Sequence, residues 1–203
     1  RPNFLIKFFF NFIEISNENY NHTDNKKFHY LGLYLSLLAK LNIKIETKKH
    51  YLPFIPNSNN IFLNKKYLLF HLDKRWETFP LKVRDNLKRK ITSLSYDNKI
   101  VVTSNIGCNN FYNFIKKKLL NSSNIEFYDE PTLNSIISLV YFSETCISSH
   151  SGLIVHTAAA FNKKIIDIVH DEIFNELDRW VPFDTNYKRY NVQNFLDESF
   201  KFA

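Results

Sequence analysis

The stretch SSHSGLIVHTAAAFNKKIIDIV, residues 148–169, decides the fold. A short polar turn leads through Gly152 into a helix predicted over residues 152–161, and the stretch ends in the apolar strand Lys164–Val169. Another strand-length run, Thr145–Ser148, comes directly before it. Successive strands joined by a helix pair in parallel, because a parallel connection needs a long crossover. The stretch therefore predicts a unit of an α/β sheet.

The same alternation extends upstream. Strands are predicted at residues 67–72, 99–103 and 125–128, and helices at residues 81–93, 109–120 and 132–142. The last of these helices follows Pro131 and has Thr132 as its expected N-cap. Five strands alternating with helices, without hairpin turn signals, predict a Rossmann-like parallel sheet with helices on both faces.

The α/β pattern divides the chain into three parts. Residues 61–170 carry the sheet. Residues 1–60 contain a helix at 28–41 and a linker at 53–60, which is rich in Pro and Asn. Residues 171–203 are predicted to be a C-terminal helical extension, interrupted at Pro182. The chain contains no Met and starts at Arg1, which indicates a fragment of a longer protein.

The net charge is +7, with a basic excess in residues 65–170 and an acidic excess in residues 171–203. A basic domain suits a phosphorylated ligand or an anionic membrane surface. Much of the charge comes from Lys in a chain also rich in Asn, Ile and Phe, so the bias of an AT-rich genome and an ordinary solvated surface remain alternatives.

Cys108 and Cys146 have neither the spacing of a zinc site nor that of a disulfide framework, which favours a reducing, cytoplasmic compartment. The apolar run near the N-terminus is interrupted by polar and charged residues and is shorter than the roughly 20 residues that cross a bilayer.

Ligands of open parallel sheets bind beyond the carboxyl ends of the strands, so the loops after the strands hold the candidate site residues. The candidate ligand-binding residues are Asp73, Lys74, Arg75, Trp76, Ser104, Ser149, His150, Ser151, Gly152 and His156. No catalytic residue and no metal ligand are assigned.

The turn before Gly152 is the most informative of these loops. Its backbone N–H groups would lie at the positive end of a helix dipole, which is a ready anion site. Ser149 and Ser151 add hydroxyl groups, and His150 or His156 could donate to a phosphate or a ribose. The alternative is an ordinary helix start with a Ser N-cap and with His156 packed under the sheet.

The loop after the first strand offers complementary groups. Lys74 and Arg75 suit phosphate oxygens, and Trp76 offers a flat face for a base or a sugar. The alternative is an exposed charged turn whose Trp packs on the next helix. A metal pair of His150 and His156 lacks a third ligand and helical i,i+4 spacing, and a serine hydrolase would need a GxSxG elbow that this turn lacks.

These motifs resemble heptosyltransferase-like glycosyltransferases, which is glycosyltransferase family 9 and its relatives. The turn and helix at residues 148–169 resemble that family's segment D-[ST]-G-x-x-H-x-A-A-A, and FHLDKRWETFP, residues 70–80, resembles its loop after the first strand of the donor domain. The similarity extends over about residues 28–180. It implies a GT-B fold, with residues 61–170 as the nucleotide-sugar-binding domain and residues 1–60 as a remnant of the acceptor domain plus a linker.

The resemblance also implies roles. Lys74 would contact the donor phosphates, Ser151 and Gly152 would hold the pyrophosphate, and His156 would orient the turn. His150 stands where the family usually has Asp, and His156 follows Gly152 by four residues instead of three. Both departures favour a divergent branch that uses another sugar. The family's general base belongs to the N-terminal domain, so none is expected in this chain.

The implied function is metal-independent sugar transfer from a nucleotide-sugar to a glycan or lipid-linked acceptor, without a cofactor, in bacterial cell-surface polysaccharide synthesis. The protein would be cytoplasmic, with possible peripheral contact at the inner face of the membrane. A nucleotide-sugar epimerase of similar fold would carry an acidic residue soon after the turn, and residues 153–156 have none. A nucleic-acid-binding module would interleave aromatic residues with the basic clusters at 88–90 and 116–118, and these clusters lack them.

Overall fold

The computed structural model describes residues 66–105, 110–129, 131–174, 181–182 and 186–199. Within these ranges the chain forms one six-stranded sheet in the order β3-β2-β1-β4-β5-β6. Every neighbouring pair of strands is parallel. The strands are β1 Leu68–His71, β2 Ile100–Thr103, β3 Ile125–Tyr128, β4 Thr145–Ser148, β5 Lys164–Val169 and β6 Tyr187–Asn191. The Rossmann-like parallel sheet predicted from the sequence is therefore confirmed.

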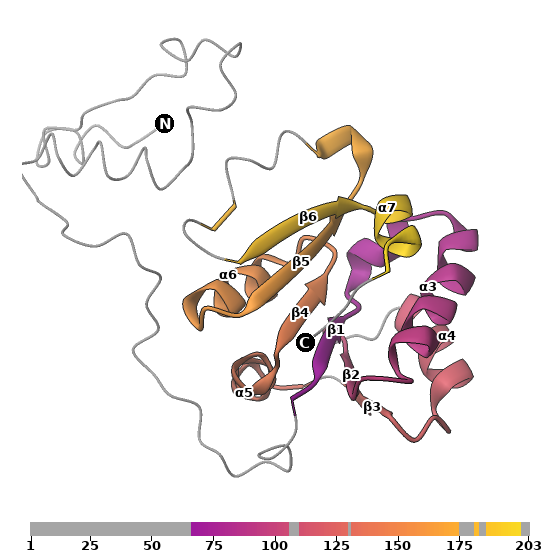
Figure 1. Ribbon diagram of the computed structural model, residues 1–203, viewed down its shortest axis with the longest axis horizontal. Helices are drawn as coiled ribbons and strands as arrows, with labels where there is room; N and C mark the ends of the chain where they lie inside the picture. The colour runs from indigo at the N-terminus through magenta and orange to yellow at the C-terminus, as the bar shows by residue number, and fades with distance from the viewer. Residues whose placement is uncertain (1–65, 106–109, 130, 175–180, 183–185, 200–203) are drawn as a thin grey trace, which may run out of the picture. The chain divides into compact units, whose positions relative to one another are not determined.

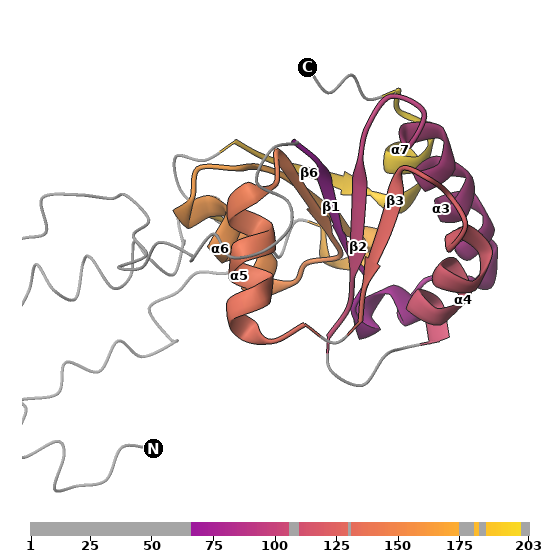
Figure 2. The same ribbon diagram turned by 90° about the horizontal axis from the view of Figure 1, so that it is seen from below.

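Helices cover both faces of the sheet. They are α3 Leu81–Leu94, α4 Asn110–Leu119, α5 Leu133–Phe142, α6 Gly152–Ala160 and α7 Val192–Asp197. Helices α3, α4 and α7 lie on one face, and α5 and α6 lie on the other (Figure 2). The three central strands β1, β2 and β4 are buried along their whole length, which explains why they read as nearly continuous apolar runs.

Successive side chains along each strand point alternately to the two faces of the sheet, where they pack into two separate hydrophobic cores. Leu68 and Phe70 of β1 point to the core under α3 and α4, whereas Leu69 points to the core under α5 and α6. The second core includes Val140 and Ala158, one from each covering helix. Because successive side chains alternate across a strand, His71 at the end of β1 belongs to the α5/α6 face.

The direction in which successive strands are added across the sheet reverses after β3, so that β4 lies on the other side of β1. The chain runs outward from β1 through β2 to β3, then returns to place β4 on the other side of β1 (Figure 1). His71 pairs with Ser148 in the β1–β4 register, so the loops that follow these two strands leave the sheet side by side. Both loops therefore lie at the same edge of one sheet. Such a switch point is the usual ligand position in an open parallel sheet.

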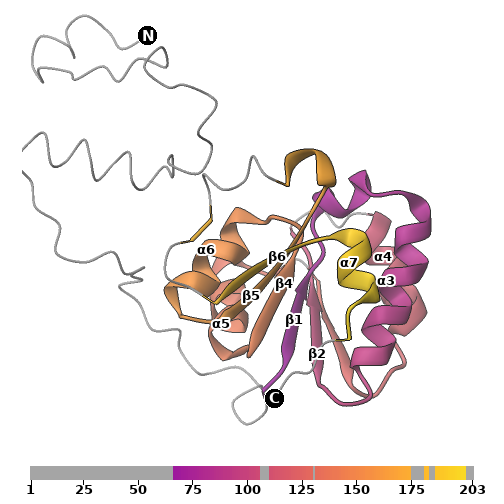
Figure 3. The same cartoon turned by 45° about the horizontal axis from the view of Figure 1, so that its top comes forward.

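The C-terminal part differs from its prediction. Among the described residues of the helical extension predicted at 171–203, Tyr187–Asn191 instead form the strand β6, which pairs in parallel with β5, and the short helix α7 follows it. Tyr187 and Tyr190 of the sequence YKRYN pack against the two cores, which stabilises an extended edge strand. Figure 3 shows α7 beside α3, and Phe195 of α7 is fully buried there.

Two helix ends follow sequence rules. Thr132 caps α5, as predicted, because its side chain accepts a hydrogen bond from the backbone N–H of Ser135 at 3.2 Å. After α6, Asn162 adopts the left-handed conformation with φ 53°. The N–H groups of Asn162 and Lys163 return to the carbonyls of Ala159 and Ala158, which is a Schellman ending. Predictions for residues 1–60, including the helix at 28–41 and the linker at 53–60, lie outside the described residues.

Candidate functional site

The start of α6 is an open set of backbone donors. Ser151 is the N-cap residue, but its hydroxyl makes no capping hydrogen bond, and the first turn of α6 has no acidic residue. Gly152 is exposed, and a Cβ built on it meets no atom within 4 Å. The first N–H groups of a helix have no partner within the helix. An anion can therefore reach the backbone at the positive end of this helix.

The turn before α6 is fixed in an unusual conformation. His150 has φ 47°, in the left-handed region that residues other than Gly rarely adopt. Its backbone N–H donates to Oδ1 of Asp167 at 2.6 Å, and its ring Nδ1 lies 2.9 Å from Oδ2 of the same carboxylate. Because an ionised carboxylate only accepts hydrogen bonds, Nδ1 carries the proton. The hydroxyl of Tyr187 donates to Oδ2 at 2.6 Å.

A buried row of polar side chains runs under this turn. Thr103, His71, Ser148 and Asp167 are register partners on four neighbouring strands, and each is at most 1% exposed. Both carboxylate oxygens of Asp167 are hydrogen-bonded, by His150 of the turn and by Tyr187. In contrast, the hydroxyl of Ser148 and both ring nitrogens of His71 have no hydrogen bond of normal geometry among the described residues. Unpartnered buried polar groups are rare and call for a missing partner. These groups lie at the carboxyl ends of β1 and β4, at the switch point.

The neutral form of His71 is favoured by its surroundings. Burial lowers the pKa of His71, and the neighbouring Asp73 carboxylate and Asn105 side chain oppose this effect only in part. A neutral imidazole has one donor and one acceptor nitrogen. The ring can therefore serve either kind of polar partner at the switch point without adding charge.

This lowered pKa has a consequence for stability. The unfolded chain takes up the proton of His71 first, so the free energy of unfolding falls as pH drops below the unfolded pKa of about 6.5. We expect His71 to contribute a slope that approaches about 1.4 kcal/mol per pH unit, and His71→Leu to remove it. Urea unfolding between neutral pH and mild acid measures this slope, with His156→Leu, at an exposed position, as the control. An unchanged slope in His71→Leu would contradict the assignment.

The loop after β1 is more ordered than predicted. It forms a short 3-10 helix, Lys74–Thr78, with Asp73 as N-cap. Asp73 is 1% exposed, and it accepts from the backbone N–H of Arg75 at 2.9 Å and from Nη1 of Arg75 at 2.6 Å. Asp73 is thus a structural cap, and its carboxylate partly neutralises Arg75. Lys74 is exposed, and none of the described residues pairs with its ammonium group.

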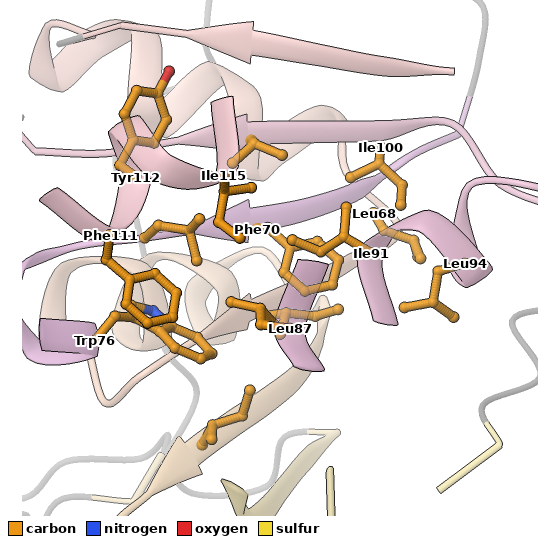
Figure 4. Close-up of a cluster of buried hydrophobic side chains, with 14 of the residues drawn as sticks. Leu68, Phe70, Trp76, Leu87, Ile91, Leu94, Ile100, Phe111, Tyr112 and Ile115 are labelled. Carbon is orange, nitrogen blue, oxygen red and sulfur yellow. The ribbon is translucent and has the colours of Figure 1, made fainter. Parts of the chain in front are cut away.

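The prediction that Trp76 offers a flat face to a ligand is wrong. Trp76 is fully buried, with its ring 5.6 Å from the ring of Phe79 and 5.7 Å from that of Phe111 between centroids. Figure 4 shows Trp76 beside Phe111 inside the core cluster under α3 and α4. Its Nε1 donates to the carbonyl of His71 at 3.0 Å. Burying the large apolar ring in the core lowers the free energy of the folded protein more than leaving it in solvent would. Through its hydrogen bond to His71, Trp76 instead anchors the loop to the end of β1.

The remaining predicted residues take three different positions. Ser149 and Ser151 lie in the turn, and each is 3% exposed. Ser104 follows β2, is fully buried, and donates to the carbonyl of Asn105 at 3.2 Å. His156 is exposed on α6, one turn after Gly152, and is not packed under the sheet. The switch point therefore gathers Lys74, Arg75 and the turn up to Gly152, whereas Trp76 belongs to the core.

Sequence reasoning overlooked Asp167 and His71. Both interrupt apolar runs that were correctly predicted to be buried strands, KIIDIV and YLLFHL. A charged residue in a buried strand needs a partner, because an unpaired buried charge is costly. That rule would have marked Asp167 as the partner of a nearby polar loop.

Two other kinds of feature are absent from the described residues. In these ranges no three His, Cys, Asp or Glu side chains gather in a way that could hold a metal ion. No helix in the same ranges has the length and the hydropathy of a membrane span.

The fold is similar to that of solved protein structures. It is the Rossmann-like fold found in GT-B glycosyltransferases. In particular, the chain is similar to the E. coli ADP-heptose LPS heptosyltransferase II, with a TM-score of 0.53 and 11% identity over 88% of this chain and 50% of that one. The resemblance predicted from the sequence is thereby confirmed at the level of the fold.

Two further solved structures have lower TM-scores. The E. coli heptosyltransferase WaaC with ADP-2-deoxy-2-fluoro heptose has a TM-score of 0.48 and 16% identity, over 68% of this chain and 43% of that one. The UDP-GlcNAc 2-epimerase from Neisseria meningitidis bound to UDP-GlcNAc has a TM-score of 0.42 and 16% identity, over 82% and 41%. The chain thus spans at most half the length of these three proteins. No protein-family model matches the chain, and no curated protein matches it in sequence.

Proposed function

We propose that this chain binds the nucleoside diphosphate of a nucleotide-sugar and forms the donor side of a glycosyltransferase. The diphosphate would sit against the first turn of α6, where Gly152 leaves the backbone open and no side chain caps the helix. This uncapped helix start at the switch point is the observation that carries the proposal. The fold shared with heptosyltransferase II supports it.

The charges at the switch point suit a diphosphate. Lys74 is an exposed cation on the neighbouring loop, and Arg75 adds a guanidinium that Asp73 holds in place. An anion at a helix N-terminus gains about 0.3–1 kcal/mol at an exposed site, and up to about 2 kcal/mol when partly buried. The hydroxyl of Ser148 and the ring of His71 lie beneath the turn as further hydrogen-bonding groups.

The same groups would serve the reaction. When a sugar leaves its nucleotide, negative charge grows on the departing diphosphate, and preorganised donors stabilise that charge more strongly in the transition state. In this proposal Lys74, Arg75 and the N–H groups of α6 take that role without a metal ion. The domain binds the donor and stabilises the leaving group, and none of the described residues is assigned as the general base.

We extend the proposal to the biological setting. The acceptor would be a glycan or a lipid-linked sugar in bacterial cell-surface polysaccharide synthesis. The protein would act in the cytoplasm, with its basic domain close to the anionic inner face of the membrane. The excess of basic over acidic residues in 65–170 supports this placement.

Lys74→Ala tests the contribution of charge. Because the change removes a phosphate partner and no base contact, we expect the Kd for ADP or UDP to rise about tenfold, with little change for adenosine or uridine. His156→Ala should have a smaller effect, through the orientation of the turn. Calorimetric titration of the full chain measures both. Lys118→Ala, an exposed charge change at the far end of α4, is the matched control. A Lys74→Ala variant that binds diphosphates like the parent would contradict the proposal.

A further inference from the structure

We infer that Asp167 is the positioning residue of the donor site, holding the turn before α6 in the conformation that receives the diphosphate. The inference rests on the proposed function for its ligand and on the geometry of the turn for its mechanism. Asp167 lies on β5, 17 residues from His150 in the sequence, and is fully buried.

The turn needs such support because its backbone is strained. His150 has φ 47°, and a residue other than Gly held in this region costs about 1–3 kcal/mol. The strain is localised one residue before Ser151, the N-cap of α6. If His150 relaxed to an extended conformation, the chain would enter α6 in another direction. The N–H groups of the first turn of α6 would then no longer point together toward the space that an anion would occupy.

Asp167 offsets this strain through both oxygens of one carboxylate. Oδ1 accepts the backbone N–H of His150 at 2.6 Å, and Oδ2 accepts its ring Nδ1 at 2.9 Å. The first bond fixes the peptide at the strained position, and the second fixes the ring that extends from it. Hydrogen bonds to a charged acceptor are about twice as strong as neutral ones. The pair therefore locks backbone and side chain together.

The carboxylate itself cannot move away. It projects from β5, an interior strand that pairs with β4 on one side and β6 on the other, and Ser148, at the end of β4, is its register partner. The hydroxyl of Tyr187 on β6 holds Oδ2 at 2.6 Å from the other side. A rigid sheet thus sets the geometry of a loop that would bind ligand. Such preorganisation reduces the cost of ordering the site when the ligand arrives.

A double-mutant cycle tests this assignment with the full chain. Asp167→Val removes both acceptors and suits a buried strand. We expect it to weaken ADP and UDP binding about tenfold, in line with the cost of the strained conformation. His150→Gly accepts the left-handed φ without strain. In that background, Asp167→Val should change binding by less than about threefold, because the strain that Asp167 offsets is absent.

Two further variants keep the test specific. Tyr187→Phe removes one hydrogen bond that holds the same carboxylate but leaves both of its bonds to His150, so it should weaken binding less than Asp167→Val does. Asp167→Asn retains one acceptor for the His150 N–H, should weaken binding less than Asp167→Val, and replaces that variant if it fails to fold. Equal losses in the His150 and Gly backgrounds would show that Asp167 does not act through His150, and would overturn the inference.

A readout without ligand separates this inference from the proposed function. Hydrogen exchange of the His150 amide should speed up in Asp167→Val, while exchange at Ala158 in the last turn of α6 stays as in the parent. Failure of the parent chain to bind ADP or UDP would overturn the proposed function, and the donor-site role of Asp167 with it. Unchanged exchange at His150 would overturn the inference alone.

Discussion

Replacing Trp76 with alanine will lower the free energy of unfolding by about 3–5 kcal/mol, the usual cost of removing a large aromatic side chain from a core. Trp76 is fully buried and packs between Phe79 and Phe111. The substitution leaves a cavity in the core under α3 and α4. It also removes the hydrogen bond that the indole N–H donates to the carbonyl of His71. Chemical denaturation at neutral pH measures the loss.

Tyr96 provides the matched control for Trp76. It is another aromatic residue of this domain, but it is 78% exposed, so Tyr96→Ala should change the free energy of unfolding by no more than about 0.5 kcal/mol. If Trp76 were a surface platform for a base, Trp76→Ala would behave like Tyr96→Ala in denaturation and would reduce nucleotide binding instead. That combination would contradict the buried position of Trp76.

Most of the fold could be predicted because its signals are local. Apolar runs such as Ile100–Thr103 are buried on both faces, so their sequence alone shows that they are central parallel strands. The periodic apolar positions of α3 and the N-cap Thr132 of α5 are equally local. The strand β6 escaped prediction because YKRYN has little intrinsic apolar character. It becomes a strand because the open edge of β5 offers it hydrogen-bond partners.

The candidate site could be predicted only in part. The small residues between a strand and a helix predict the turn before Gly152 from sequence alone. The pairing of β1 with β4 places this turn beside the loop that carries Lys74. Whether Trp76 faces solvent or the core depends on Phe111, 35 residues away in sequence (111 − 76), and sequence spacing does not reveal that contact. The role of Asp167 could not be predicted for the same reason, because Asp167 lies on β5 and its partner His150 lies in the turn before α6.

Replacing Gly152 with valine will abolish nucleotide-diphosphate binding and leave the fold intact. The φ of Gly152 lies outside the left-handed region, and a Cβ placed there meets no atom of another element within 4 Å, so the free protein has open space at the first carbon of a side chain. The same side chain would occupy the space where a phosphate approaches the N–H groups of α6. We expect the Kd to rise by about a hundredfold or more, as the helix dipole and hydrogen-bond contributions are lost together.

The stability of Gly152→Val should change little. Valine in place of glycine at the first position of a helix removes some backbone freedom from the unfolded chain, and the loss of χ1 freedom in the helix is of similar size, each below about 1 kcal/mol. Ala160→Val places a branched side chain at the other end of the same helix and is the matched control for binding. Gly152→Ala, with its smaller side chain, should fall between the parent and Gly152→Val.

The central claim is that the start of α6 holds the diphosphate of a nucleotide-sugar. Calorimetric titration of the full chain with ADP and UDP, in the parent, Gly152→Val and Ala160→Val, tests it most directly. We expect the parent and Ala160→Val to bind at least one of the two diphosphates with similar Kd, whereas Gly152→Val, still cooperatively folded, should bind neither. Gly152→Val binding with the Kd of the parent would show that the turn before α6 is only a helix start, and would contradict the account.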